Sequence, residues 1–98
     1  MTRCLALLTF TEQGLRHVQQ SAKRAAAFRE SVEKSGGKVL AQYWALGEAD
    51  GCVLFETTDE ETAGSLLLAL AQAGNVRTRT LRLYDEQEFA RMVAGVSA

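Results

Sequence analysis

The side chains that could take part in chemistry are few, and they lie far apart in the sequence. His17 is the only histidine, and an imidazole can act as a general base or as an axial ligand of haem. Its polar surroundings, with Arg16 and Gln19 close by, favour a solvated surface position instead. Because no cluster of cysteines or further histidines accompanies it, we expect no metal site and no cofactor.

An aromatic pair and an acidic turn follow in the middle of the chain. Tyr43 and Trp44 are adjacent, so in a strand their side chains point to opposite faces. Either ring can form the wall of a ligand pocket, although such rings more often lie in the core or at a subunit interface. Asp50 stands in a turn beside glycine, where its carboxylate can lie at the mouth of a pocket or bond to its own backbone.

A basic stripe begins after Asn75. Arg77 and Arg79 share one face of a predicted strand, and Arg82 lies on the other. Two arginines on one face can hold a carboxylate or a phosphate through forked hydrogen bonds, or they can protect an edge strand by their charge. The residues that we predict to line a small-molecule site are His17, Trp44, Asp50, Asn75 and Arg79.

The two cysteines are not expected to react. Cys4 and Cys52 lie in apolar segments that are predicted to be strands, where a thiol is usually inert. Their spacing fits neither a metal-ligand pair nor a redox motif. If these strands are antiparallel neighbours, the two residues lie on the order of ten ångströms or more apart, beyond the reach of a disulfide.

Composition excludes several classes of protein. With 98 residues, of which 47% are hydrophobic and 23% charged, the chain fits one globular domain over residues 1–98. The net charge of -1 gives no field that attracts nucleic acid, and the apolar run near the N-terminus is too short to span a membrane. We therefore expect a cytoplasmic protein without nucleic-acid or membrane partners. The sequence also lacks a phosphate loop, a dinucleotide fingerprint and a nucleophile elbow.

Hydrophobic periodicity and turn signals define the elements that must position these side chains. Runs rich in apolar residues predict four strands, at 2–10, 38–46, 52–57 and 76–84. Helical spacing predicts helices over 15–35, from Thr58 to the Gly74-Asn75 stop, and over 86–93.

Polar residues at the predicted helix starts suggest caps. Ser21 is a candidate N-cap within the first helical segment. Thr58 and Glu61 have the spacing of a capping box at the start of the second helix. The final helix is expected to bury Phe89, with Val93 as a second candidate.

The order of the elements is β-α-β-β-α-β with a terminal helix. The tight turn over residues 47–51 predicts a hairpin, which argues against an all-parallel sheet. Two right-handed crossovers around that hairpin predict an α+β, ferredoxin-like βαββαβ fold. The antiparallel sheet then has the strand order 4-1-3-2.

One face of this sheet has no obvious cover. Both helices of the fold pack on the same face, yet both faces of the first three strands carry apolar residues. Soluble monomers rarely expose a large apolar patch, so we favour a homodimer packed sheet against sheet. The alternative is that the terminal helix folds over this face within one chain.

Several segments resemble the GYD-domain family. They are Thr11–Gly14, Gly36–Val39, the turn Gly47-Glu48-x-Asp50 and Gly74–Leu81, and the resemblance extends from about residue 2 to residue 92. The family is named for Gly-x-Tyr-Asp, and Ala49 stands here in place of the tyrosine. The resemblance implies a dimeric α/β barrel of ferredoxin-like subunits. It implies little about activity, because the wider group includes cofactor-free monooxygenases, haem-degrading enzymes and stress-response proteins.

Three functions fit these observations. The first is a small homodimeric binding or accessory protein with a mostly apolar pocket between sheet and helices, in which a small ligand shifts the melting temperature without turnover. The second is a cofactor-free monooxygenase or isomerase that loses turnover when His17 or Asp50 is mutated. The third is a purely structural oligomer, with a sheet-to-sheet interface and no cavity.

Overall fold

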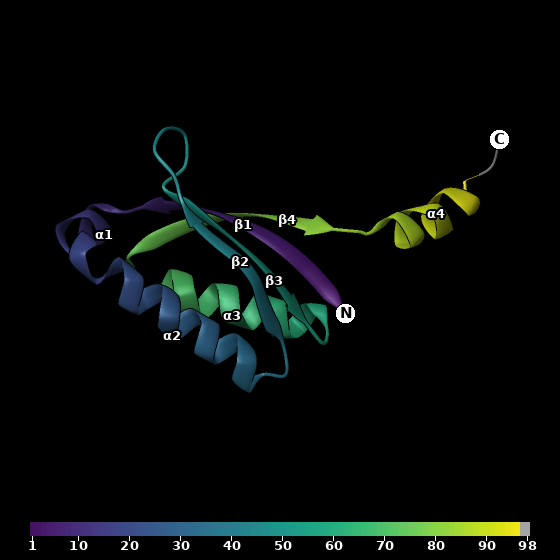
Figure 1. The fold of residues 1–98 in the computed structure, drawn as a ribbon, viewed down its shortest axis with the longest axis horizontal. Helices are drawn as coiled ribbons and strands as arrows, with labels where there is room; N and C mark the ends of the chain where they lie inside the picture. Colours follow the sequence, from purple (N-terminus) through teal and green to yellow (C-terminus); the bar gives the residue numbers. More distant parts are fainter. Residues whose placement is uncertain (97–98) are drawn as a thin grey trace.

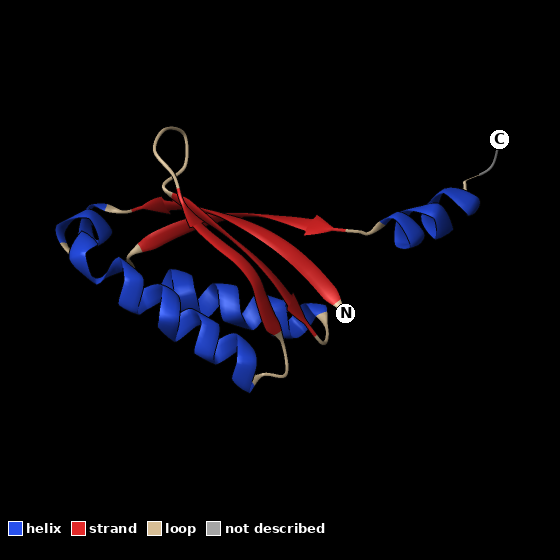
Figure 2. Cartoon of the chain, in the orientation of Figure 1, coloured by secondary structure: helices blue, strands red, loops and turns tan. Residues whose placement is uncertain are grey.

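Four strands form one antiparallel sheet. The computed structural model describes residues 1–96, and the strands lie side by side in the order β2-β3-β1-β4 (Figure 2). Their bounds are β1 Thr2–Phe10, β2 Lys38–Trp44, β3 Gly51–Thr57 and β4 Val76–Leu83. Counted from the other edge, this is the order 4-1-3-2, so the predicted strand order and the ferredoxin-like α+β fold are confirmed. The last two residues of the predicted domain, 97–98, lie outside the described residues.

Two long helices cover one face of the sheet, and a third stands apart from it (Figure 1). The covering helices are α2 Ser21–Lys34 and α3 Glu60–Gln72. A short helix α1, Glu12–Arg16, and a 3-10 turn η1, Val18–Gln20, lead into α2. The last helix, α4 Glu86–Ala94, projects from the end of β4, away from the body of the molecule.

The helix starts differ from the predicted caps. Ser21 is the first residue of α2 and caps nothing, because its hydroxyl donates to the Val18 carbonyl over 2.6 Å. Helix α3 is capped by Asp59, whose carboxylate accepts the Thr62 N–H at 2.8 Å, so the capping box predicted at Thr58 is wrong. Helix α3 therefore starts at Glu60, one residue later than a cap at Thr58 would place it.

The core lies between the sheet and the two covering helices. Cys4 and Ala6 from β1 and Val53 and Phe55 from β3 are at most 5% exposed. Phe28 of α2 meets Phe55 edge to face, with ring centroids 5.4 Å apart. Alternation along each strand sends these residues to one side, which we call the covered face.

The opposite side of the sheet, the open face, carries a row of leucines. Leu5 is the direct cross-strand partner of both Leu54 and Leu81, so the three side chains lie abreast across β3, β1 and β4. Leu81 is 52% exposed. In the part of the chain that the structure describes, the helices pack on the covered face or stand clear of the sheet (Figure 1).

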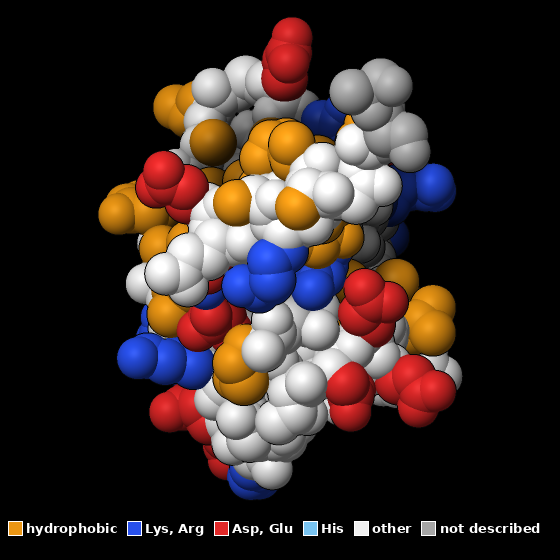
Figure 3. All heavy atoms as spheres, turned by 90° about the vertical axis from the view of Figure 1, so that its right-hand side faces the viewer, with side chains coloured by type: hydrophobic (Ala, Val, Ile, Leu, Met, Phe, Trp, Pro, Cys, Tyr) orange, Lys and Arg blue, Asp and Glu red, His pale blue; other side chains and the backbone are white. Residues whose placement is uncertain are grey.

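Helix α4 does not bury the residues that were expected to pack. Phe89 is 59% exposed and Val93 is 51% exposed, so the prediction that the final helix buries Phe89 is wrong. The Cα radius of gyration, 14.9 Å, exceeds the value of about 13 Å expected for a compact chain of this length, as a projecting helix requires. Seen from this end, hydrophobic side chains reach the surface among acidic and basic ones (Figure 3).

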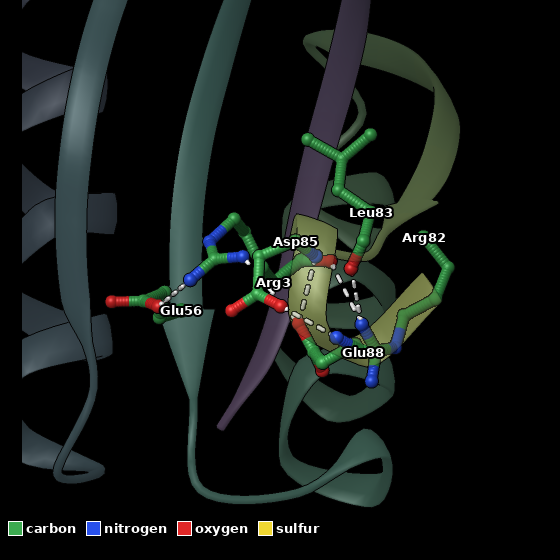
Figure 4. Close-up of polar contacts among 6 residues, drawn as sticks. All are labelled: Arg3, Glu56, Arg82, Leu83, Asp85 and Glu88. Atoms are coloured by element: carbon green, nitrogen blue, oxygen red, sulfur yellow. Dashed lines mark hydrogen bonds and ion pairs between the residues drawn. The ribbon is translucent and has the colours of Figure 1, made fainter. Parts of the chain in front are cut away.

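Polar contacts hold the first turn of α4 to the end of the sheet (Figure 4). Asp85 and Glu88 form a reciprocal capping box, with bonds of 2.8 and 2.9 Å between each side chain and the other's N–H. Arg3 of β1 lies 2.9 Å from the Glu56 carboxylate and 3.7 Å from that of Glu88. The ion pair between Arg3 and Glu88 therefore joins the first turn of α4 to the sheet, while the apolar side of the helix is exposed.

Candidate ligand cavity

A cavity of about 360 Å³ lies between the covered face and the two covering helices. On the helix side, small side chains stand beside the larger Phe28, Leu66 and Leu70. The small residues are Ala25, Ala27 and Ser31 of α2, Ser65 and Ala69 of α3, and Ala73 directly after α3. Alanine and serine are too short to fill the space between two helices and a sheet, and most of these residues are exposed, so the cavity is open to solvent on this side.

The sheet side of the cavity is apolar. Leu8 and Phe10 of β1, Val53 of β3 and Val76 of β4 form this wall. Trp44, at the end of β2, also lines the cavity and is 51% exposed, so its ring lies between the cavity and solvent. A ligand held here would contact the single tryptophan of the chain.

A few polar groups interrupt the apolar lining. Arg24 of α2 donates from Nη1 to the His17 carbonyl at 2.9 Å and from Nη2 to the Ser21 hydroxyl at 3.2 Å. Gln42 donates from Nε2 to the Cys52 carbonyl at 3.3 Å. Arg24 is the one ionisable side chain among the described residues that line the cavity.

The structure brings together two of the five predicted site residues. Trp44 and Asn75 both line the cavity. His17, Asp50 and Arg79 are outside its lining. His17 is exposed at the end of α1, where its backbone carbonyl, and not its imidazole, accepts from Arg24. Arg79 instead borders a shallow surface depression beside α1 and β4.

Asp50 has a structural role. Its carboxylate accepts the N–H of Phe10 at 2.8 Å, its own N–H donates to the Leu8 carbonyl at 2.8 Å, and its carbonyl accepts from Ala45 at 2.9 Å. One residue therefore joins the end of β1 to both arms of the β2–β3 hairpin. The structure therefore gives the carboxylate neither of the two predicted roles: it is outside the cavity lining, and it bonds to the backbone of β1 and not to its own turn.

A second set of contacts joins α1 to the connection between α3 and β4. The Thr11 hydroxyl donates to the Gly74 carbonyl at 2.6 Å, and its N–H donates to the Asn75 carbonyl at 3.0 Å. Gln13 donates from Nε2 to the Asn75 side-chain oxygen at 3.0 Å. A Cβ on Gly14 would lie 2.0 Å from the Asn75 backbone oxygen, so only glycine fits there. These contacts position Asn75 beside the cavity.

Sequence reasoning missed Arg24, although a signal for it was present. Arg24, Phe28 and Ser31 recur at helical spacing on α2, and Phe28 is buried. An arginine on the same side of a helix as a buried phenylalanine faces the sheet. The residue type of Arg24 points to solvent, and only its position in the helical period points to the cavity.

The lining limits the chemistry that the cavity can perform. Among its described residues there is no histidine, cysteine, carboxylate, lysine or tyrosine that could move a proton. Cys4 lies on the covered face, where burial raises the pKa of its thiol and keeps it protonated. Both cysteines are free, as predicted. Over residues 1–96 no group of three or more His, Cys, Asp or Glu side chains could hold a metal ion.

These features define an α+β protein of the ferredoxin-like class with an apolar cavity between its sheet and two long helices. A crystal structure of a Thermus thermophilus protein has the same fold, with a TM-score of 0.55 and 20% sequence identity, covering 87% of this chain and 95% of that one. No helix among the described residues is long and apolar enough to cross a membrane.

The sequence comparisons identify the family. The model of the GYD domain matches residues 4–93, so the chain belongs to the GYD domain family, as the resemblance implied. A relative from Thermus thermophilus is 32% identical over 82 residues, which make up 83% of this chain and 86% of the relative. That relative is named "Glutamine synthetase and cystathionine beta-lyase binding protein".

Proposed function

We propose that this protein is a small homodimeric accessory protein that binds enzymes and takes up a small molecule between its sheet and its helices. The observation that carries the proposal is the uncovered leucine row of the open face, Leu5, Leu54 and Leu81. Such a row, which crosses three of the four strands, is typical of a surface that meets another protein.

A second copy of the chain is the partner that covers most of this surface at once. Two open faces can pack against each other about a two-fold axis, as sheets do in sandwiches, and each leucine row is then buried by the other. Helix α4 supports the same arrangement. This helix carries the exposed Phe89 and Met92 and projects beyond the end of β4, where a partner's surface would receive it.

Enzymes are the further partners that we propose. The relative's name attributes to it binding of glutamine synthetase and cystathionine beta-lyase, and the two chains match over most of their lengths. We propose that the corresponding enzymes of this protein's own host are its targets. A cytoplasmic location fits such targets, and the two free cysteines fit a reducing compartment.

The dimer is tested by light scattering on the wild type and Leu81→Glu. Because Leu81 is half exposed in the single chain, glutamate is tolerated in the fold but places a charge in the proposed interface. We expect a dimer for the wild type and a folded monomer for the variant. Leu68→Glu is the matched control, since Leu68 is 72% exposed on α3, far from the open face. A wild-type monomer at all concentrations would refute the dimer.

Enzyme binding is tested with purified glutamine synthetase and cystathionine beta-lyase from the same host. In bio-layer interferometry, the immobilised wild-type protein should bind at least one of these two enzymes. Binding to neither enzyme would refute this part of the proposal and leave the dimer to be judged by light scattering.

A further inference from the structure

We propose that the cavity takes a ligand with an apolar body and a single carboxylate, and that Arg24 receives the carboxylate. This inference rests on the proposed uptake of a small molecule and deepens it by naming the chemical class. It follows from three features of the cavity: its walls, its one charge, and the way in which that charge is held.

The walls select the apolar body. Phe10, Val53 and Leu66 contribute side chains from two strands and from α3, and Trp44 adds an aromatic surface. Apolar surface removed from water is the main source of affinity in such a site, and a hydrocarbon or aromatic body gains most from it. A cavity of about 360 Å³ falls in the lower part of the range for small-molecule sites.

The charge selects the head group. Arg24 is partly buried, and its guanidinium carries a positive charge. Within residues 1–96 it takes part in none of the ion pairs, all of which join other residues. A cation beside an apolar space, with no ion-pair partner among the described residues, attracts an anion more strongly than an exposed cation does.

The hydrogen bonds of Arg24 orient it and leave part of it available. Its bonds to the His17 carbonyl and the Ser21 hydroxyl use two of its five N–H groups. The remaining N–H groups can form the forked pair that a carboxylate accepts. Since no second cation lines the cavity, one negative charge is matched and a doubly charged phosphate is not.

The test compares three ligands of equal chain length: decanoate, decanol and decylamine, each below its micelle-forming concentration. Binding is followed by calorimetry and by the fluorescence of Trp44, the only tryptophan of the chain, which lines the cavity. We expect decanoate to bind roughly tenfold more tightly than decanol, because of its charge-assisted hydrogen bonds, and decylamine to bind most weakly.

Three variants test whether the preference for decanoate depends on Arg24 and on the cavity. Arg24→Gln should reduce decanoate affinity to that of decanol and leave decanol affinity unchanged. Arg29→Gln is the matched control, since Arg29 lies exposed on the same helix and outside the cavity lining, and it should change neither affinity. Ala69→Phe should fill the cavity and abolish binding of both ligands.

The outcomes separate this inference from the proposed function. Equal affinities of the wild type for decanoate and decanol would refute the preference for a carboxylate head group. The proposed uptake of small molecules would still stand. A preference for decanoate that persists in Arg24→Gln would overturn the assignment to Arg24. Binding of none of the three would overturn the uptake itself, while the dimer is measured separately on the same preparation by light scattering.

Discussion

On β3, Val53 and Phe55 are 1% and 0% exposed, whereas Leu54 between them lies on the face that no helix covers. The two faces carry residues of similar hydrophobicity, but only one of them is covered within residues 1–96. Helices α2 and α3 bury the covered face, while the open face and the apolar side of α4 stay partly exposed. Residue type therefore does not by itself tell which apolar face is buried within the chain, because that depends on where the helices are connected.

The largest effect that tests this comparison is expected at Phe55. Phe55→Ala removes a fully buried ring and its edge-to-face contact with Phe28, and it should lower the free energy of unfolding by about 3–5 kcal/mol. Urea denaturation followed by circular dichroism measures the loss, which should not depend on protein concentration. Leu54→Ala is the control on the open face. If Leu54→Ala lowered the free energy of unfolding of the diluted monomer as much as Phe55→Ala does, the distinction between the two faces would be contradicted.

The next effect is expected at the close backbone contact between α1 and the connection from α3 to β4. Gly14→Ala places a Cβ against the Asn75 carbonyl, and it should cost more than about 1 kcal/mol of stability. Gly64→Ala is the matched control, because a Cβ at Gly64 in α3 meets no atom within 4 Å. That change should raise stability by about 0.5–1 kcal/mol. Thermal unfolding measures both variants. Melting temperatures that shift in the same direction in Gly14→Ala and Gly64→Ala would refute the role of this contact.

A smaller effect on folding is expected at α4. Phe89→Ser should change the unfolding free energy of the diluted chain by no more than about 0.5 kcal/mol, because Phe89 is 59% exposed there. If the proposed dimer forms, the same variant should raise its dissociation constant, which sedimentation analysis measures. Arg91→Gln on the same helix is the control. A large loss of monomer stability in Phe89→Ser would show that α4 packs within its own chain.

The smallest effect concerns the two aspartate caps. Backbone N–H groups of Thr62 and Glu88 lower the pKa of Asp59 and of Asp85, respectively, below the usual range. The stability that each cap contributes is therefore present above the unfolded-state pKa, and it is lost as the pH falls through the lower folded-state pKa, below about pH 4.

The two caps should differ in what their loss disturbs. Protonation of Asp59 weakens α3 and should appear in global unfolding, whereas protonation of Asp85 should fray α4 alone. Hydrogen exchange as a function of pH distinguishes these results. Asp59→Asn and Asp85→Asn keep an N-cap but remove its titration, and each should abolish the corresponding pH dependence. Equal effects on global stability would contradict the comparison.

Much of the fold was predictable because local signals agreed. Alternation marked the strands, the glycines at residues 36–37 and 74 ended helices, and the hairpin turn fixed the antiparallel order. The cap of α3 was less predictable. Thr58 and Asp59 are adjacent and are both good capping residues, so residue type alone does not choose between them.

The candidate site was predictable only in part. Trp44 and Asn75 were identified as polar or aromatic residues near strand ends, and both line the cavity. Arg24 was missed, and the carboxylate of Asp50 joins β1 to the hairpin. A cavity arises from what neighbouring side chains fail to fill, and the facing alanines and serines of α2 and α3 gain meaning only when the two helices are placed together.

The sequence by itself determined the order of the elements, the strand order and the apolar character of both sheet faces, because these follow from periodicity and turn chemistry within short segments. Tertiary structure alone decided that α4 projects, that Arg24 faces an open apolar space, and that Asp50 ties strands together. Each of these depends on distances between segments remote in the chain, and no local pattern encodes such distances.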